Sequence, residues 1–237
     1  MPEAAILLAV PARAGGPGAA ARSPKADTSP RGRDAAGVSG VRHIGLFGGS
    51  FDPVHNAHLA LARHALDELA LDALCWVPTG QPWQKTRVMT PAVHREAMLR
   101  LAIGNDPHSR LERCELERDG PSYTLDTVRE LQAANGDARW FLIIGQDQFA
   151  GLHTWRGFEE LLPRVTLAVA MRPGAPASAD ARVLAAPRCE LRMPAMAISS
   201  TDIRGRIAAG LDVSALVPPA VAQYIHQHHL YRGSTGS

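Results

Sequence analysis

The sequence has few cysteines, no long apolar run and no net charge beyond its first forty residues. The three cysteines, Cys75, Cys114 and Cys189, lie far apart without a C-x-x-C pair. This spacing predicts reduced thiols in a cytoplasmic protein rather than a disulfide framework. No apolar run approaches the roughly 18–20 residues that a bilayer span requires, so we expect no membrane partner.

The formal net charge of +2 comes entirely from residues 1–40, which hold five Lys or Arg and three Asp or Glu. A formally neutral remainder argues against a broad nucleic-acid-binding surface, although a small polyphosphate pocket stays compatible with it. The same forty residues are rich in Ala, Gly, Pro, Ser and Arg, without sustained periodicity. Such a composition buries too little apolar surface to offset its ordering entropy. We therefore predict a disordered extension over 1–40 and one domain over 41–234.

Two common phosphate-binding signatures are absent. The chain contains neither G-x-G-x-x-G before a helix nor G-x-x-x-x-G-K-[ST], so dinucleotide redox chemistry and P-loop hydrolysis lose their usual support. A zinc site would need a third ligand at a recognisable spacing from the pair His55 and His58, and no such pattern is present. A metal-dependent hydrolase is therefore disfavoured.

From residue 41 onward, strand-like and helix-like segments alternate. This alternation implies βαβ crossovers and predicts an α/β fold, a Rossmann-like doubly wound and mainly parallel sheet. Ligands of such sheets bind beyond the carboxyl ends of the strands. The expected strands are 41–47, 73–77, 111–116, 140–144, 165–170 and 189–193, and the expected helices are 56–70, 91–103, 124–134, 158–162, 200–209 and 218–227, with a polar loop over 171–188.

The segment Gly-Gly-Ser-Phe-Asp-Pro-Val-His-Asn-Ala-His, residues 48–58, joins the first expected strand to the first expected helix. A strand–glycine turn–helix unit directs backbone N–H groups at one point, and the helix dipole adds positive charge there, which is typical of a phosphate site. His55 and His58 indicate that this phosphate is reacted on as well as held. Taken alone, the glycines are equally compatible with an ordinary turn, and the histidines with a metal pair.

The segment resembles the G-x-F-x-P-x-H-x-x-H signature of the nucleotidyltransferase α/β-phosphodiesterase superfamily. Residues 198–204, Ile-Ser-Ser-Thr-Asp-Ile-Arg, resemble the second motif of that superfamily, I-S-S-T-x-I-R. A Ser-Ser-Thr run at a helix start offers hydroxyl and N–H donors, and Arg204 adds a two-pronged phosphate donor. The two motifs occur in the expected order, so each supports the other.

Within the superfamily, the chain is most similar to the nicotinate mononucleotide adenylyltransferases. Residues 82–86 stand in place of a P-P-H-K-like loop, 121–127 resemble P-S-Y-T-x-x-T, 143–147 resemble I-I-G-x-D, and Trp155 matches a pyridine-stacking tryptophan. Two departures stand out. Ala57 replaces a glycine at the expected closest approach to phosphate, and Trp83-Gln84 replaces a Pro-His pair.

This resemblance implies transfer of the adenylyl group of ATP to nicotinate mononucleotide with release of pyrophosphate, a step of NAD biosynthesis, with Mg²⁺ bound through the ATP phosphates. The implied catalytic residues are His55, His58 and Arg204. The implied ATP-binding residues are Gly48, Gly49, Ser50, Phe51, His55, His58, Gly145, Asp147, Ser199, Ser200, Thr201, Ile203 and Arg204. The implied mononucleotide-binding residues are Lys85, Thr86, Tyr123, Thr124, Thr127, Asp147 and Trp155.

Several alternatives stay open at this stage. Pantetheine-phosphate adenylyltransferase and cytidylyltransferases share the H-x-x-H site, and a non-catalytic nucleotide sensor could use the same fold. Trp155 could be a core residue, Asp147 a helix cap and Lys85 a solvated loop residue. The sequence also leaves open the choice between nicotinate and nicotinamide mononucleotide, and whether the chain forms a homo-oligomer.

Overall fold

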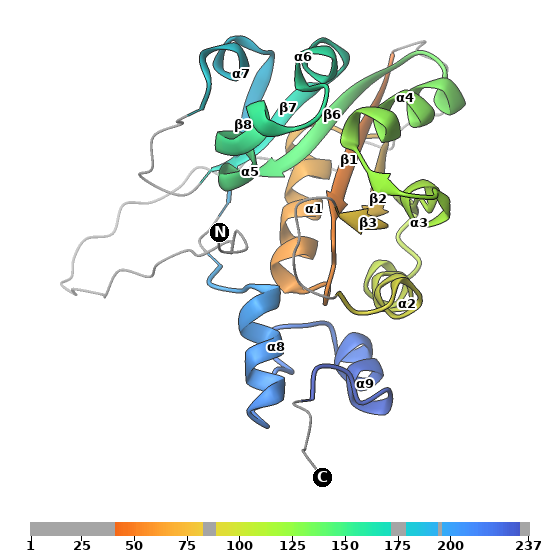
Figure 1. Ribbon diagram of the computed structural model, residues 1–237, viewed down its shortest axis with the longest axis vertical. Helices are drawn as coiled ribbons and strands as arrows, with labels where there is room; N and C mark the ends of the chain where they lie inside the picture. Colours follow the sequence, from red (N-terminus) through yellow and green to blue (C-terminus); the bar gives the residue numbers. More distant parts are fainter. Residues whose placement is uncertain (1–40, 83–88, 172–178, 194–195, 233–237) are drawn as a thin grey trace, which may run out of the picture.

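The fold is a doubly wound α/β sandwich built on one parallel sheet (Figure 1). The computed structural model describes residues 41–82, 89–171, 179–193 and 196–232, so the predicted extension over 1–40 lies outside the described part. The main sheet contains β1 (Arg42–Gly49), β2 (Ala73–Pro78), β4 (Ser109–Leu111), β6 (Ala138–Gly145), β7 (Thr166–Met171) and β8 (Arg188–Arg192). A separate parallel pair joins β3 (Gln81–Pro82) to β5 (Pro121–Ser122).

The strand order of the main sheet is β4-β2-β1-β6-β7-β8, and every neighbouring pair is parallel. The chain builds outward from β1 on one side and then crosses to β6 on the other. The direction in which successive strands are added to the sheet reverses between β1 and β6. At such a point the loops after the two strands diverge and leave room for a ligand. The predicted fold class is therefore confirmed. Gly48 and Gly49 at the end of β1, and Gly145 at the end of β6, both lie at this point of the sheet.

Helices cover both faces of the sheet. One face packs against α1 (Asn56–Glu68) and α2 (Ala92–Ile103). The same core cluster continues beyond the sheet into α8 (Ser200–Ala208) and α9 (Pro219–Gln227), of which α9 packs against α2 (Figure 1). The other face of the sheet packs against α4 (Thr124–Asn135), α5 (Gln146–Gly151), η1 (Leu152–Thr154), α6 (Phe158–Leu161), η2 (Leu162–Arg164) and α7 (Ala181–Ala185). Alternate residues of the strands serve the two faces, as the pleat requires: Phe47 and Ile143 face α1, whereas Leu46 and Ile144 face α4.

Two predicted segments were wrong. Residues 111–116 were expected to form one strand, but β4 ends at Leu111 and α3 (Cys114–Glu117) follows, which turns the Glu115 carboxylate inward. The predicted loop over 171–188 contains α7, whose N-cap Asp180 accepts a hydrogen bond from the Arg182 N–H. An aspartate at an N-cap supplies the acceptor that a short helix needs.

In the described part of the chain, no helix combines the length and the apolar character that crossing a bilayer would demand. The cysteines Cys75, Cys114 and Cys189 are all free thiols. Burial raises the pKa of the Cys75 thiol to about 12, so this cysteine behaves as a core residue rather than a nucleophile.

Candidate active site

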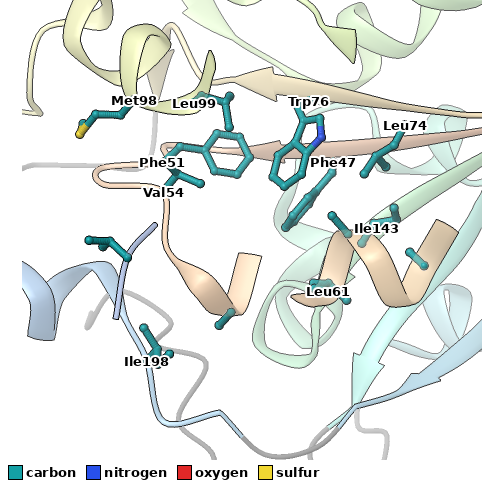
Figure 2. Close-up of a cluster of buried hydrophobic side chains, with 14 of the residues drawn as sticks. Phe47, Phe51, Val54, Leu61, Leu74, Trp76, Met98, Leu99, Ile143 and Ile198 are labelled. Carbon is teal, nitrogen blue, oxygen red and sulfur yellow. The ribbon is translucent and has the colours of Figure 1, made fainter. Parts of the chain in front are cut away.

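The turn after β1 is anchored to the core by Phe51. This residue has a left-handed φ of 48°, and its ring is 1% exposed. The ring meets Phe47 edge-on at 5.6 Å and His58 at 5.2 Å, and Figure 2 shows Phe51 and Phe47 close to Trp76 in the same cluster. A Cβ on Gly49 would lie 3.1 Å from the Phe51 ring. The side chain of Phe51 therefore fixes the turn, and only its backbone is left to meet a ligand.

The two histidines lie stacked at the start of α1. Their ring centroids are 3.6 Å apart with an interplanar angle of 17°, and the His55 N–H donates to His58 Nδ1 at 3.2 Å. A ring nitrogen that accepts carries no proton, so this bond places the proton of neutral His58 on Nε2. Nε2–H is the donor that His58 can offer to an anion.

His55 is 2% exposed, and burial lowers its pKa to about 3. It is therefore neutral near pH 7. Its Nδ1 is buried without a hydrogen-bond partner among the described residues. A buried polar atom without a partner is uncommon in a native structure and is a feature of sites completed by a ligand.

The start of α1 is less open than the sequence suggested. The Asn56 N–H donates to the Leu216 carbonyl at 2.9 Å, so the first amide of the helix is already used. Ala57, expected at the closest approach to phosphate, is 2% exposed and packs into the core cluster of α1 and the sheet. The methyl group at which this chain departs from the resembled motif therefore faces the core.

The second motif docks directly onto the first. Arg204 Nη1 donates to the Asp52 carbonyl at 2.6 Å, and Ser200 Oγ donates to the Pro53 carbonyl at 3.0 Å. Arg204 Nη2 also donates to Thr201 Oγ1 at 3.1 Å. The bonds to Asp52 and Pro53 join residues 152 and 147 positions apart in the chain, so the Arg204 guanidinium lies beside the turn that leads into the stacked histidines.

The remaining predicted residues of this motif divide between cap and core. Ser199 is the N-cap of α8, and its side chain accepts the Asp202 N–H at 3.0 Å. Ile203 is 0% exposed and belongs to the core cluster. Its side chain therefore packs in the core, and the predicted part of Ile203 in ATP binding could involve only its backbone.

At the end of β6, Gly145 is the N-cap of α5, and its N–H donates to Gln148 Oε1 at 3.0 Å. Asp147 is exposed in the first turn of this helix, so the cap is Gly145 rather than Asp147. Because β6 adjoins β1, both residues lie at the carboxyl ends of the strands, beside the turn after β1.

Trp155 follows η1 and is half-buried against the α4 side of the sheet. The next residue, Arg156, places its guanidinium 4.5 Å from the centroid of the Tyr123 ring. Tyr123 precedes α4, and Thr124 begins it. The cation–π contact thus brings the Trp155 segment next to the predicted mononucleotide-binding segment. Arg156 was missed because a single arginine in a loop carries no pattern.

Thr127 is 0% exposed, and its hydroxyl donates to Glu115 Oε1 at 2.8 Å. Thr127 therefore joins α4 to α3, and its predicted part in shaping the mononucleotide pocket could come only through this support. Burial raises the pKa of Glu115. A Cβ on Gly80 would lie 1.9 Å from the Glu115 carbonyl, so the segments after β2 and β4 are packed backbone to backbone. Lys85 and Thr86 lie outside the described residues.

Comparisons with known proteins agree with this geometry. The cytidylyltransferase-like family model matches residues 46–206, which include both motifs. A protein of Methylibium petroleiphilum named probable nicotinate-nucleotide adenylyltransferase is 50% identical over 205 residues, covering 84% of this chain and 97% of that protein. A Bordetella petrii protein of the same name is 50% identical over 198 residues, covering 81% of this chain and all of that protein.

A solved structure of Plasmodium falciparum nicotinic acid mononucleotide adenylyltransferase, complexed with NaAD, superimposes with a TM-score of 0.66 at 20% identity. The match covers 80% of this chain and 97% of the other. At that identity the likeness supports the fold, while the sequence matches carry the family. The chain therefore belongs to the nicotinate-nucleotide adenylyltransferase family of cytidylyltransferase-like proteins.

Proposed function

We propose that the chain transfers the adenylyl group of ATP to nicotinate mononucleotide, forming nicotinate adenine dinucleotide and pyrophosphate in NAD biosynthesis. The observation that carries the proposal is the docking of Arg204 and Ser200 on the turn that leads to the stacked histidines. This docking brings hydrogen-bond donors for phosphate oxygens together at one point. Family membership supports the choice of substrates.

The chemistry is an in-line displacement at phosphorus. A phosphate oxygen of the mononucleotide bonds to the α-phosphorus of ATP, and the bond from that phosphorus to the bridging oxygen of the β-phosphate breaks. The nucleophile is already an anion, so no general base is needed. What the protein supplies is alignment and fixed donors for the charge that develops.

In this proposal, His58 Nε2–H and the neutral ring of His55 donate to the α-phosphate. The backbone of Gly48–Phe51 adds N–H donors. Arg204, with Ser199, Ser200 and Thr201, holds the β- and γ-phosphates, which leave as pyrophosphate. Arg204 is suited to this role because its planar guanidinium binds two phosphate oxygens at once.

Magnesium is the proposed cofactor, carried by the ATP phosphates. Among the described side chains, no group of three or more His, Cys, Asp or Glu is arranged to hold a metal ion. Mg²⁺ needs no such group, because it keeps most of its water and binds substrate phosphates rather than an all-protein cage. When bound, the ion neutralises phosphate charge.

For the second substrate, we propose that Trp155 stacks on the pyridine ring and that Asp147 accepts from a ribose hydroxyl. In the same proposal, Tyr123 and Thr124 bind this substrate together with Lys85 and Thr86. We further propose that residues 41–234 form the catalytic unit. Deletion of residues 1–40 should then leave kcat unchanged.

The test is pyrophosphate release from ATP and magnesium with four acceptors: nicotinate mononucleotide, nicotinamide mononucleotide, phosphopantetheine and phosphocholine. We expect the highest kcat/KM with nicotinate mononucleotide. Preference for phosphopantetheine would identify the alternative, pantetheine-phosphate adenylyltransferase. Under the same conditions, His58→Ala should lower kcat by about 10²–10³, the scale of a lost electrostatic donor. A loss below threefold would remove His58 from the proposed site.

A further inference from the structure

Asp52 is a buried carboxylate inside the turn, and phosphate binding does not explain it. The side chain is 0% exposed. Its Oδ1 accepts the Tyr231 hydroxyl at 2.7 Å, and its Oδ2 accepts the Thr90 N–H at 3.3 Å. A buried carboxylate is tolerated only when such donors satisfy it. The donors come from the C-terminal end of the described chain and from the segment before α2, so three distant segments meet at one side chain.

Arg95 of α2 strengthens the same junction. It is 1% exposed, its Nε donates to the Thr90 carbonyl at 2.9 Å, and its Nη1 donates to the Ser50 carbonyl at 3.0 Å. One rigid guanidinium thus ties the segment before α2 to the turn after β1. We call Asp52, Thr90, Arg95 and Tyr231 the Asp52 clamp.

The clamp reaches the proposed phosphate site through the backbone of Asp52. The carbonyl of this residue accepts Arg204 Nη1 at 2.6 Å, while its carboxylate is held by Tyr231. The position of the Arg204 guanidinium therefore depends on the position of the Asp52 backbone, which the clamp determines. Neither Tyr231 nor Arg95 belongs to the predicted substrate-binding set.

Tyr231 is well suited to hold Asp52. The residue follows α9 with a left-handed φ of 64°, a backbone conformation that non-glycine residues seldom adopt. Burial and the neighbouring Asp52 raise the pKa of Tyr231 well above its ordinary value. The phenol therefore remains a hydrogen-bond donor throughout the neutral range.

We propose that Tyr231 and Arg95 are positioning residues for adenylyl transfer, acting through Asp52 to hold Arg204 where the leaving pyrophosphate forms. This inference rests on the proposed role of Arg204 as a phosphate ligand. A small displacement of such a ligand weakens contacts that matter most in the transition state, so it lowers kcat more than it raises KM.

The decisive variant is Tyr231→Phe, which keeps the ring and removes only the hydroxyl. We expect kcat to fall about tenfold, with the KM values for ATP and the mononucleotide within about twofold of wild type. The matched control is Tyr224→Phe on α9, whose hydroxyl lies 3.0 Å from His94 Nδ1 instead of at the clamp. The control should keep the wild-type kcat. Arg95→Lys keeps the charge but loses the two-point geometry, and it should lower kcat as well.

The double variant Tyr231→Phe/Arg204→Ala tests whether Tyr231 acts on catalysis through Arg204. If Tyr231 acts through Arg204, Tyr231→Phe should add less than about twofold to the loss caused by Arg204→Ala. A full additional tenfold loss would overturn the inference, as would a Tyr231→Phe protein with a lower Tm but an unchanged kcat per folded molecule.

Arg204→Ala also tests the underlying proposal. Wild-type activity in that variant would reject the phosphate site itself, whereas loss of activity there with an unaffected Tyr231→Phe rejects only the clamp.

Discussion

The stability of the protein should fall as the pH drops below 6.5, because His55 is buried as a neutral side chain. Burial lowers the pKa of His55 from 6.5 to about 3. Between these values the unfolded chain binds a proton that the folded chain does not, so acid favours unfolding. The slope approaches ~1.4 kcal/mol per pH unit, and His55 alone should remove about 2 kcal/mol from the free energy of unfolding between pH 7 and pH 5.

Urea unfolding at pH 7, 6 and 5, followed by circular dichroism, measures this loss in the wild type and in His55→Asn. The variant lacks a group that titrates in this window, so its free energy of unfolding should fall by about 2 kcal/mol less than that of the wild type. Other titrating groups are shared by both proteins and cancel in the comparison. His226→Asn, at an exposed position of α9, serves as the control and should follow the wild type. Equal losses in His55→Asn and the wild type would refute the buried neutral histidine.

Three further predictions concern the α4 side of the site. Trp155→Ala should raise KM for the mononucleotide about 3–10-fold in steady-state assays, the value of one aromatic stack, and an unfolded variant would show that Trp155 is a core residue instead. Thr127→Val leaves Glu115 without its hydroxyl donor and should lower the free energy of unfolding by ~1–3 kcal/mol; a change under 0.5 kcal/mol would contradict the bond. Gly80→Ala would overlap the Glu115 carbonyl and should lower the free energy of unfolding in urea by at least ~1–3 kcal/mol, whereas a neutral result would contradict the close packing.

Much of the fold could be predicted because apolar periodicity reports the core. The buried strands β1, β2, β6 and β7 and the helices α1 and α4 all carry strong patterns, and each was expected within a few residues of its observed bounds. The failures were short elements whose structure depends on tertiary contacts. α3 forms where Glu115 meets Thr127, and α7 forms around one cap, so neither has enough residues to show a helical period.

The candidate site divides in the same way. The motifs indicated His55, His58 and Arg204 because their spacing is distinctive. Spacing alone did not show that Ile203 and Thr127 turn inward, because helix-start residues lie on either side according to how the helix docks. Arg95 and Tyr231 were missed for a related reason: each is one residue in an ordinary helix or tail, and its importance comes from contact with a residue far away in the sequence.

The bond from Tyr231 to Asp52 spans 179 residues, and this separation has a consequence for biosynthesis. A ribosome adding 5–20 residues per second makes Asp52 roughly 10–35 s before Tyr231. During that interval the nascent chain can form β1 and α1, but the buried carboxylate of Asp52 lacks its phenol donor. The turn would therefore reach its final arrangement late in synthesis, and a chain truncated before Tyr231 would carry both motifs without the last of the contacts that hold them in place.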